Sequence, residues 1–226
     1  MFRNPLWLIA ILLLAQITVA EATPTSISTG YQVEELGYFT GTLDYVAVSP
    51  SAASLTLVLN NSSSTAAGGK ITGVALNVPT VSGVSITGLT STAPNAYFSQ
   101  LGLSFDSINT SPLGKFDFGS ALGGNWQGGG SPNNGIAVNS TGTFTFNFTG
   151  TNLNALSTQS FIDAVSASKS QIPPQFMAVR FKGFTEGDSD KVGAVDPPPV
   201  PVPASVWLML SGLGSLGVIS RKRKTA

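Results

Sequence analysis

The feature that most limits the fold is a strict alternation of phenylalanine with polar residues in the second half of the chain. Over residues 142–150, Phe144, Phe146 and Phe148 alternate with threonine and asparagine. Successive side chains of a β-strand point to opposite faces, so this spacing predicts a strand with one buried aromatic face and one polar face. Residues 53–60 repeat the alternation with leucine at every second position. The chain is therefore expected to fold mainly through half-buried strands.

Further strands are expected where short apolar segments lie between clusters of Gly, Pro, Asn and Ser, namely over residues 42–48, 71–78, 84–89, 101–105, 115–118 and 175–184. Short strands at this spacing predict a mainly β body over residues 23–195, an antiparallel sandwich or jelly-roll-like single domain. One segment departs from the alternation. Its spacing predicts a short helix over residues 158–167, capped by Ser157 or Thr158 and covering an open edge or end of the sandwich. A covered loop would produce nearly the same pattern.

The N-terminus has the three parts of a secretory signal peptide over residues 1–22. Arg3 gives a positive start, residues 6–15 form an apolar stretch, and Ala20 and Ala22 are small residues at the positions that a signal peptidase reads. Ten residues make about 15 Å of helix, half of a hydrocarbon core of about 30 Å. Cleavage is therefore expected, and an uncleaved anchor is the alternative.

Composition narrows the chemistry of the body. The chain has no Cys and no His, which excludes disulfides, Ser-His-Asp and Cys-His catalysis, and zinc sites built on those residues. Residues 23–203 carry a net charge of −4, so no nucleic-acid partner is expected. Asp106 and Asp117 formally resemble a glycosidase acid–base pair, although Asp at strand ends commonly supports turns. We predict a non-enzymatic protein with no catalytic residue and no cofactor.

An acidic segment near the end of the body raises the question of a metal. Glu186, Asp188 and Asp190 stand at alternate positions and supply oxygens that a calcium ion could collect if the loop curled. The segment lacks the glycine and glutamate spacing of an EF-hand loop. A solvated acidic turn is the alternative, and no other metal site is predicted.

The glycine-rich segment over residues 123–139 contains a lone tryptophan. Trp126 in an exposed loop can stack on a sugar ring while Asn125 and Gln127 hydrogen-bond hydroxyl groups. Alternatively, Trp126 folds back to cover the open end of the sandwich. These three residues are the candidate ligand site of the body.

The C-terminus divides into three segments. Residues 196–203 hold five prolines and predict an extended spacer, and residues 204–220 contain no charge and predict a transmembrane helix. Residues 221–226 begin with Arg221, Lys222, Arg223 and Lys224, which the positive-inside rule places in the cytoplasm as a stop-transfer signal. The body is then left outside.

This order of parts resembles the PEP-CTERM sorting signal of Gram-negative bacteria. Pro201, Val202 and Pro203 stand where the common form has Pro-Glu-Pro, so Val202 departs from it. The resemblance implies processing near these prolines by an exosortase, a membrane protease or transpeptidase. It also implies export through the inner membrane, transient anchoring, and a final place at the cell surface or in an extracellular matrix with exopolysaccharide and biofilm. A carbohydrate-binding module and, less favoured, a glycan-acting enzyme are the alternatives for the body.

Overall fold

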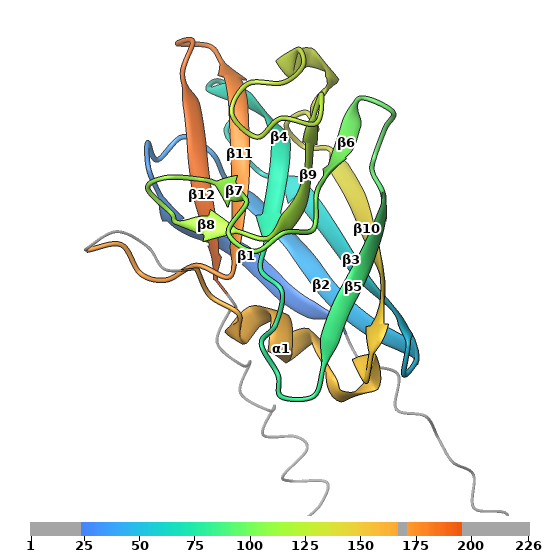
Figure 1. The fold of residues 1–226 in the computed structure, drawn as a ribbon. Helices are drawn as coiled ribbons and strands as arrows, with labels where there is room; N and C mark the ends of the chain where they lie inside the picture. Colours follow the sequence, from blue (N-terminus) through green and yellow to red (C-terminus); the bar gives the residue numbers. More distant parts are fainter. Residues whose placement is uncertain (1–23, 167–170, 196–226) are drawn as a thin grey trace, which may run out of the picture.

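The computed structural model describes residues 24–166 and 171–195. Ten strands of this part form one antiparallel sheet in the order β5-β10-β3-β2-β1-β12-β11-β4-β9-β6 (Figure 1). The bounds are β1 Thr25–Gln32, β2 Phe39–Ser49, β3 Ala52–Asn61, β4 Gly68–Leu76, β5 Ser85–Thr92, β6 Phe98–Leu101, β9 Phe118–Leu122, β10 Thr141–Thr151, β11 Met177–Phe184 and β12 Ser189–Val195. A second sheet pairs β7 Ile108–Asn109 with β8 Lys115–Phe116, and the helical elements are η1 Pro132–Asn134, η2 Leu153–Ala155 and α1 Thr158–Asp163.

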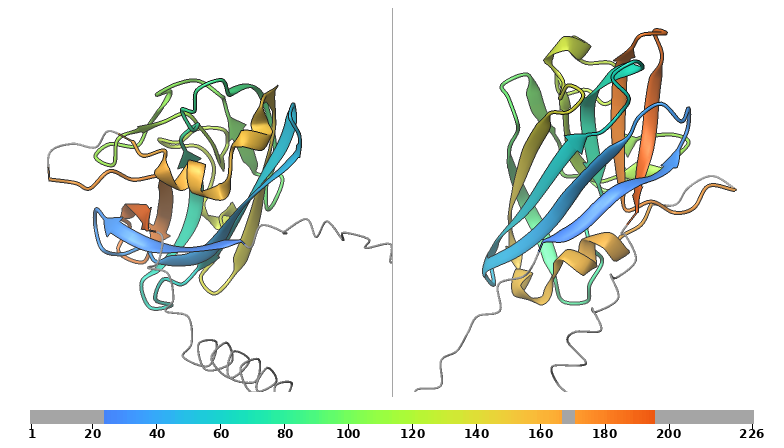
Figure 2. Two further views of the ribbon diagram at one scale, coloured as in Figure 1. Left: turned by 90° about the horizontal axis from the view of Figure 1, so that it is seen from below. Right: turned by 180° about the vertical axis from the view of Figure 1, so that it is seen from behind.

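The ten-stranded sheet curls until its two ends approach each other (Figure 2). Phe118 on β9 meets Phe146 and Phe148 on β10 edge-on, with ring centroids 5.2 and 5.4 Å apart. The end strands β5 and β6 come close enough for the Gln100 side chain to donate to the Leu89 carbonyl at 3.2 Å. The mainly antiparallel β class is confirmed, but the strands form one nearly closed sheet where a sandwich would need two separate ones.

The two alternating segments form the neighbouring strands β3 and β10, and each buries the apolar face that the sequence predicts. On β10 the three phenylalanines are at most 1% exposed, and their register partners on β3 are Leu57, Leu55 and Ala53. On its other side β3 pairs with β2 in a register that sets Leu57 opposite Leu43 and Leu55 opposite Tyr45. Apolar cross-strand neighbours on one face stabilise a pairing, because a slip by one residue would turn all of them to solvent.

Other strands differ from the predictions. The sequence patterns did not indicate β1, and they assigned most of β12 to an acidic turn. The strand predicted over residues 101–105 is wrong, because β6 ends at Leu101 and Phe105 is 81% exposed in the following loop. An apolar residue within a polar segment, such as Phe105, has the same sequence pattern as a strand position.

The predicted helix is confirmed in place and is shorter than expected. Ser157 caps α1 in a capping box with Ser160, and the helix ends at Asp163 because Ala164 leaves the helical region. Phe161 packs on Tyr45 and Phe148 at centroid distances of 5.2 and 5.7 Å. The helix therefore closes one end of the core, as Figure 2 shows.

A second layer covers part of the outer face of the sheet. Gly73, Ala75, Ala121 and Ala178 face outward from β4, β9 and β11, and Ala75, Ala121 and Ala178 belong to a separate buried cluster with Ile108, Leu113, Phe116 and Trp126. Small residues on the strands leave room for large side chains from the loops. Strands β4 and β9 are consequently buried on both faces over most of their length.

The predicted signal peptide, proline spacer, transmembrane helix and basic tail lie outside the described residues. Over residues 24–166 and 171–195, no helix is long and apolar enough to cross a bilayer.

Candidate functional site

A hollow beside α1, which we call the helix-side pocket, has a volume of about 590 Å³. Four segments line it: the chain after β4, the loop after β6, the chain from β8 to β9, and α1 with the residues that follow it. Its lining residues are Asn77, Val78, Pro79, Thr80, Val81, Phe105, Asp106, Lys115, Asp117, Ser160, Asp163, Ala164, Val165 and Ser166.

Asp117 fixes the floor of this pocket. Its side chain is 3% exposed, and its two carboxylate oxygens accept backbone N–H groups of Val78 and Asp106, each at 2.8 Å. These bonds tie the chain after β4 to the loop after β6. Asp106 itself is exposed and has a left-handed backbone, with φ of 55°. The structure therefore brings Asp106 and Asp117 together, and the Asp117 carboxylate has a structural role in holding two connections.

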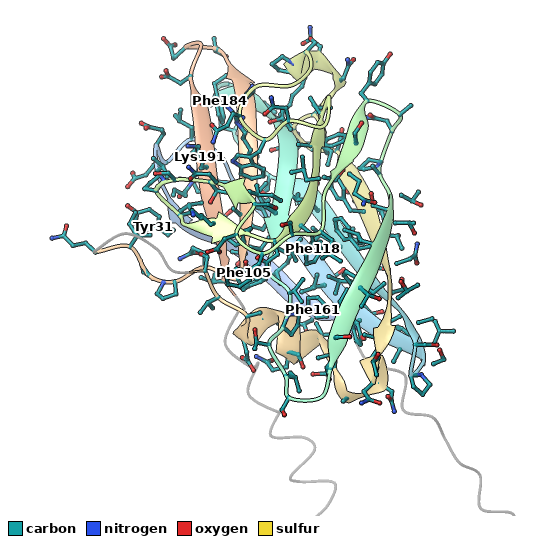
Figure 3. All side chains as sticks on the ribbon, in the orientation of Figure 1. Tyr31, Phe105, Phe118, Phe161, Phe184 and Lys191 are labelled. Atoms are coloured by element: carbon teal, nitrogen blue, oxygen red, sulfur yellow. The ribbon has the colours of Figure 1, made fainter. Side chains whose placement is uncertain are left out.

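The rim of the helix-side pocket is apolar and exposed. Phe105 is 81% exposed, Val165 51% and Val81 37% (Figure 3 labels Phe105). Carboxylate, hydroxyl and ammonium groups of Asp106, Asp163, Ser160 and Lys115 stand among them. An exposed aromatic ring beside convergent polar groups is the arrangement that sugar sites use. Sequence reasoning missed Phe105, although an aromatic residue within a run of turn-forming residues is a usable indication.

Trp126 does not have the exposed ring that a sugar platform needs. It is 4% exposed, and its six-membered ring lies over Gly73, where an added Cβ would be 3.3 Å from two ring carbons. Its Nε1 is buried without a hydrogen-bond partner. The alternative of a tryptophan that folds back is the one observed, with the difference that it covers the outer face of the sheet rather than an open end.

Asn125 and Gln127 are exposed beside Trp126 in a shallow groove of about 410 Å³. Their polar groups largely hold the loop together. The Asn125 side chain accepts the Gln127 N–H at 2.8 Å, and Gln127 Nε2 donates to the Asn109 carbonyl at 2.7 Å. The groove therefore lacks the free aromatic face on which the ligand prediction depended.

The three carboxylates of the calcium candidate have different surroundings in the structure. Asp190 is 1% exposed, and its carboxylate accepts four backbone N–H groups, from Glu34, Leu36, Gly37 and Lys191, at 2.7–3.0 Å. A carboxylate has about four acceptor positions, so none is left for a cation. Glu186 and Asp188 are exposed on the turn before β12. Across the described ranges, no group of three or more acidic, His or Cys side chains could hold a metal ion.

The sorting signal has a counterpart among known families. Residues 199–224 match the family model of the PEP-CTERM protein-sorting motif. The match includes Pro201, Val202, Pro203 and the four cations Arg221, Lys222, Arg223 and Lys224, all of them outside the described residues. The predicted cleavage positions Ala20 and Ala22 also lie outside them. No curated protein sequence matches the chain.

Proposed function

We propose that this PEP-CTERM domain-containing protein is a non-enzymatic component of the cell surface or extracellular matrix, associated with exopolysaccharide. The observation that supports this proposal is the family match over residues 199–224, which implies recognition by an exosortase, export and sorting to the surface. The finer statements about matrix, polysaccharide and absence of catalysis rest on the composition and geometry of the body.

The three C-terminal segments suit a substrate that is processed at the membrane. The transmembrane helix that the sequence predicts over residues 204–220 would restrict the chain to the plane of the bilayer, and the basic tail would fix its direction. Five prolines over residues 196–203 favour an extended backbone that cannot be taken up into a sheet. An extended segment held at a fixed height above the membrane is a suitable target for an embedded peptidase.

The experiment is replacement of Pro201 and Pro203 by Ala in the native host. We expect unchanged membrane insertion and loss of C-terminal processing. Cell fractionation measures the insertion, and mass spectrometry of the C-terminus measures the processing. Replacement of Pro197 and Pro198 by Ala is the matched control, because these prolines precede the family match. Normal maturation of the first variant would contradict recognition at this site.

The geometry of the two aspartates supports a non-enzymatic body. A glycosidase needs one carboxylic acid and one carboxylate that are both free to reach the substrate. Both oxygens of Asp117 are already bonded to backbone N–H groups, so the helix-side pocket offers Asp106 and Asp163 on its surface and a fixed carboxylate in its floor.

Carbohydrate binding is the second candidate function, and the exposed ring of Phe105 favours it. If the helix-side pocket holds a sugar, Phe105→Ala should reduce retention on an insoluble exopolysaccharide, because the stacking face is removed. Tyr97→Ala is the control, since Tyr97 is 59% exposed and does not line this pocket. Equal retention of both variants and the unmodified protein would exclude the pocket.

A further inference from the structure

The outer face of β4, β11 and β12 carries a cluster of cations, which we call the cation cluster: Lys70, Arg180, Lys182 and Lys191. The body has six Lys and Arg side chains and a net negative charge. Four of these six cations belong to the cation cluster. Figure 3 labels Lys191 on β12. The concentration of like charges is unusual because it is unfavourable unless something compensates for it.

Strand register places these side chains next to one another. Arg180 is the partner of Lys191 on β12, and Lys182 is the partner of Lys70 on β4. Register partners have Cβ atoms about 5 Å apart, and residues two apart on a strand face the same side at about 6.6 Å. Burial and, secondarily, the charge of Arg180 lower the pKa values of Lys182 and Lys191.

No carboxylate compensates for the cluster within the described ranges. None of its members has an acidic group within 4.0 Å there, and Asp190, the neighbour of Lys191, points to the opposite face and is occupied by backbone N–H groups. Lys191 donates to the Ser111 carbonyl and Lys70 to the Asn133 side chain at 3.2 Å. The available acceptors are thus neutral oxygens.

The guanidinium of Arg180 has no hydrogen-bond or ion-pair partner among the described residues. Arg180 is 8% exposed, and its Nε is buried. The buried Nε1 of Trp126 is also without a hydrogen-bond partner. The Trp126 ring lies over Gly73, which is the β4 partner of Arg180. Buried donors without acceptors are rare in folded proteins, so each of these two requires an explanation.

We propose that the cation cluster is a binding site for an oxyanion, with Arg180 at its base and the half-buried Lys182 and Lys191 at its opening. A carboxylate, sulfate or phosphate group supplies the several acceptor oxygens that these donors lack, and an oxyanion accepts strong charge-assisted bonds from Arg and Lys. The shared chemistry has two sources: a free inorganic ion, or the carboxylate of an acidic polysaccharide. The site is independent of the sorting signal and is distinct from the helix-side pocket.

The test is calorimetric titration of the full chain in detergent with sodium sulfate, sodium phosphate and polygalacturonate, at one ionic strength balanced with sodium chloride. We expect Lys182→Gln and Lys191→Gln each to weaken binding about tenfold, because each removes a charge-assisted hydrogen bond. Lys169→Gln is the matched control, since it removes the same charge from a lysine of the body that is neither a member of the cation cluster nor one of the residues named for the helix-side pocket. Circular dichroism checks that each variant is folded. The buried Arg180 is left in place, because its replacement could unfold the protein.

Every outcome bears on the proposal. Binding of the inorganic ions that both variants weaken, with the control unchanged, supports a site for a free oxyanion. Binding of polygalacturonate alone with the same dependence supports a site for a carboxylate carried by a polymer. No binding of any probe, binding that neither cluster variant weakens, or equal weakening in Lys169→Gln overturns the proposal. C-terminal processing is measured separately, so failure here is distinguishable from failure of the proposed function.

Discussion

Replacement of Asp190 by Asn tests how the fold holds the connection between β1 and β2. The Asp190 carboxylate accepts N–H groups of Leu36 and Gly37 at one oxygen and of Glu34 and Lys191 at the other. An asparagine keeps the shape and replaces one oxygen by an NH2 group, which then faces two N–H donors. The substitution therefore removes two hydrogen bonds to a buried charge without creating a cavity.

The magnitude follows from those two bonds. A hydrogen bond to a charged group contributes about 1.5–3 kcal/mol, so the loss of two corresponds to about 3–6 kcal/mol. Movement of the connection will recover part of this, and we expect a decrease of about 3 kcal/mol in the free energy of unfolding. For a body of this size that lowers the melting temperature by about 6–12 °C.

The assay is urea unfolding of the purified protein, followed by far-ultraviolet circular dichroism. Asp188→Asn is the matched control, because it removes the same charge from an exposed position two residues earlier. The control should change the free energy of unfolding by no more than about 0.5 kcal/mol. Equal stability of the two variants would refute the reasoning that the Asp190 carboxylate fixes this connection.

Three further predictions concern the core and its cover. Trp126→Ala should lower the free energy of unfolding by about 3 kcal/mol in urea unfolding, because a buried ring is removed from over Gly73; an unchanged midpoint would show that the ring is dispensable. Burial raises the pKa of Tyr45 from 10.0 to about 12, and its hydroxyl donates to the Leu153 carbonyl at 2.8 Å. The neutral phenol thus contributes stability that is complete below pH 10 and is lost as the pH rises to 12. Tyr45→Phe should remove this decline in unfolding curves measured at several pH values. Parallel pH profiles of the variant and the parent would count against this prediction. Ser157→Ala removes the cap of α1 and should destabilise by about 1 kcal/mol in thermal unfolding, whereas no change would mean that Phe161 alone holds the helix.

Individual residues show how far sequence reasoning reached into the sites. Asp106 and Asp117 are only eleven residues apart in a segment rich in turn-forming residues, so the sequence could pair them, and the structure shows that the contact is between the Asp106 backbone N–H and the Asp117 carboxylate. The burial of Trp126 was one of two alternatives that composition left open, since a glycine-rich loop is compatible with either. Asp190 was grouped with its exposed sequence neighbours, although its partners lie as far as 156 residues away in the chain.

The sequence by itself determined the buried faces of β3 and β10, the position and cap of the short helix, and the sorting signal at residues 199–224. These are local properties, since they depend on residues two to four positions apart or on one contiguous segment. Only the tertiary structure decided that ten strands close into one sheet, that loops cover its outer face, and that four cations meet on β4, β11 and β12. Those outcomes depend on which strands pair, and strand alternation indicates which side of a strand is buried without specifying its neighbours.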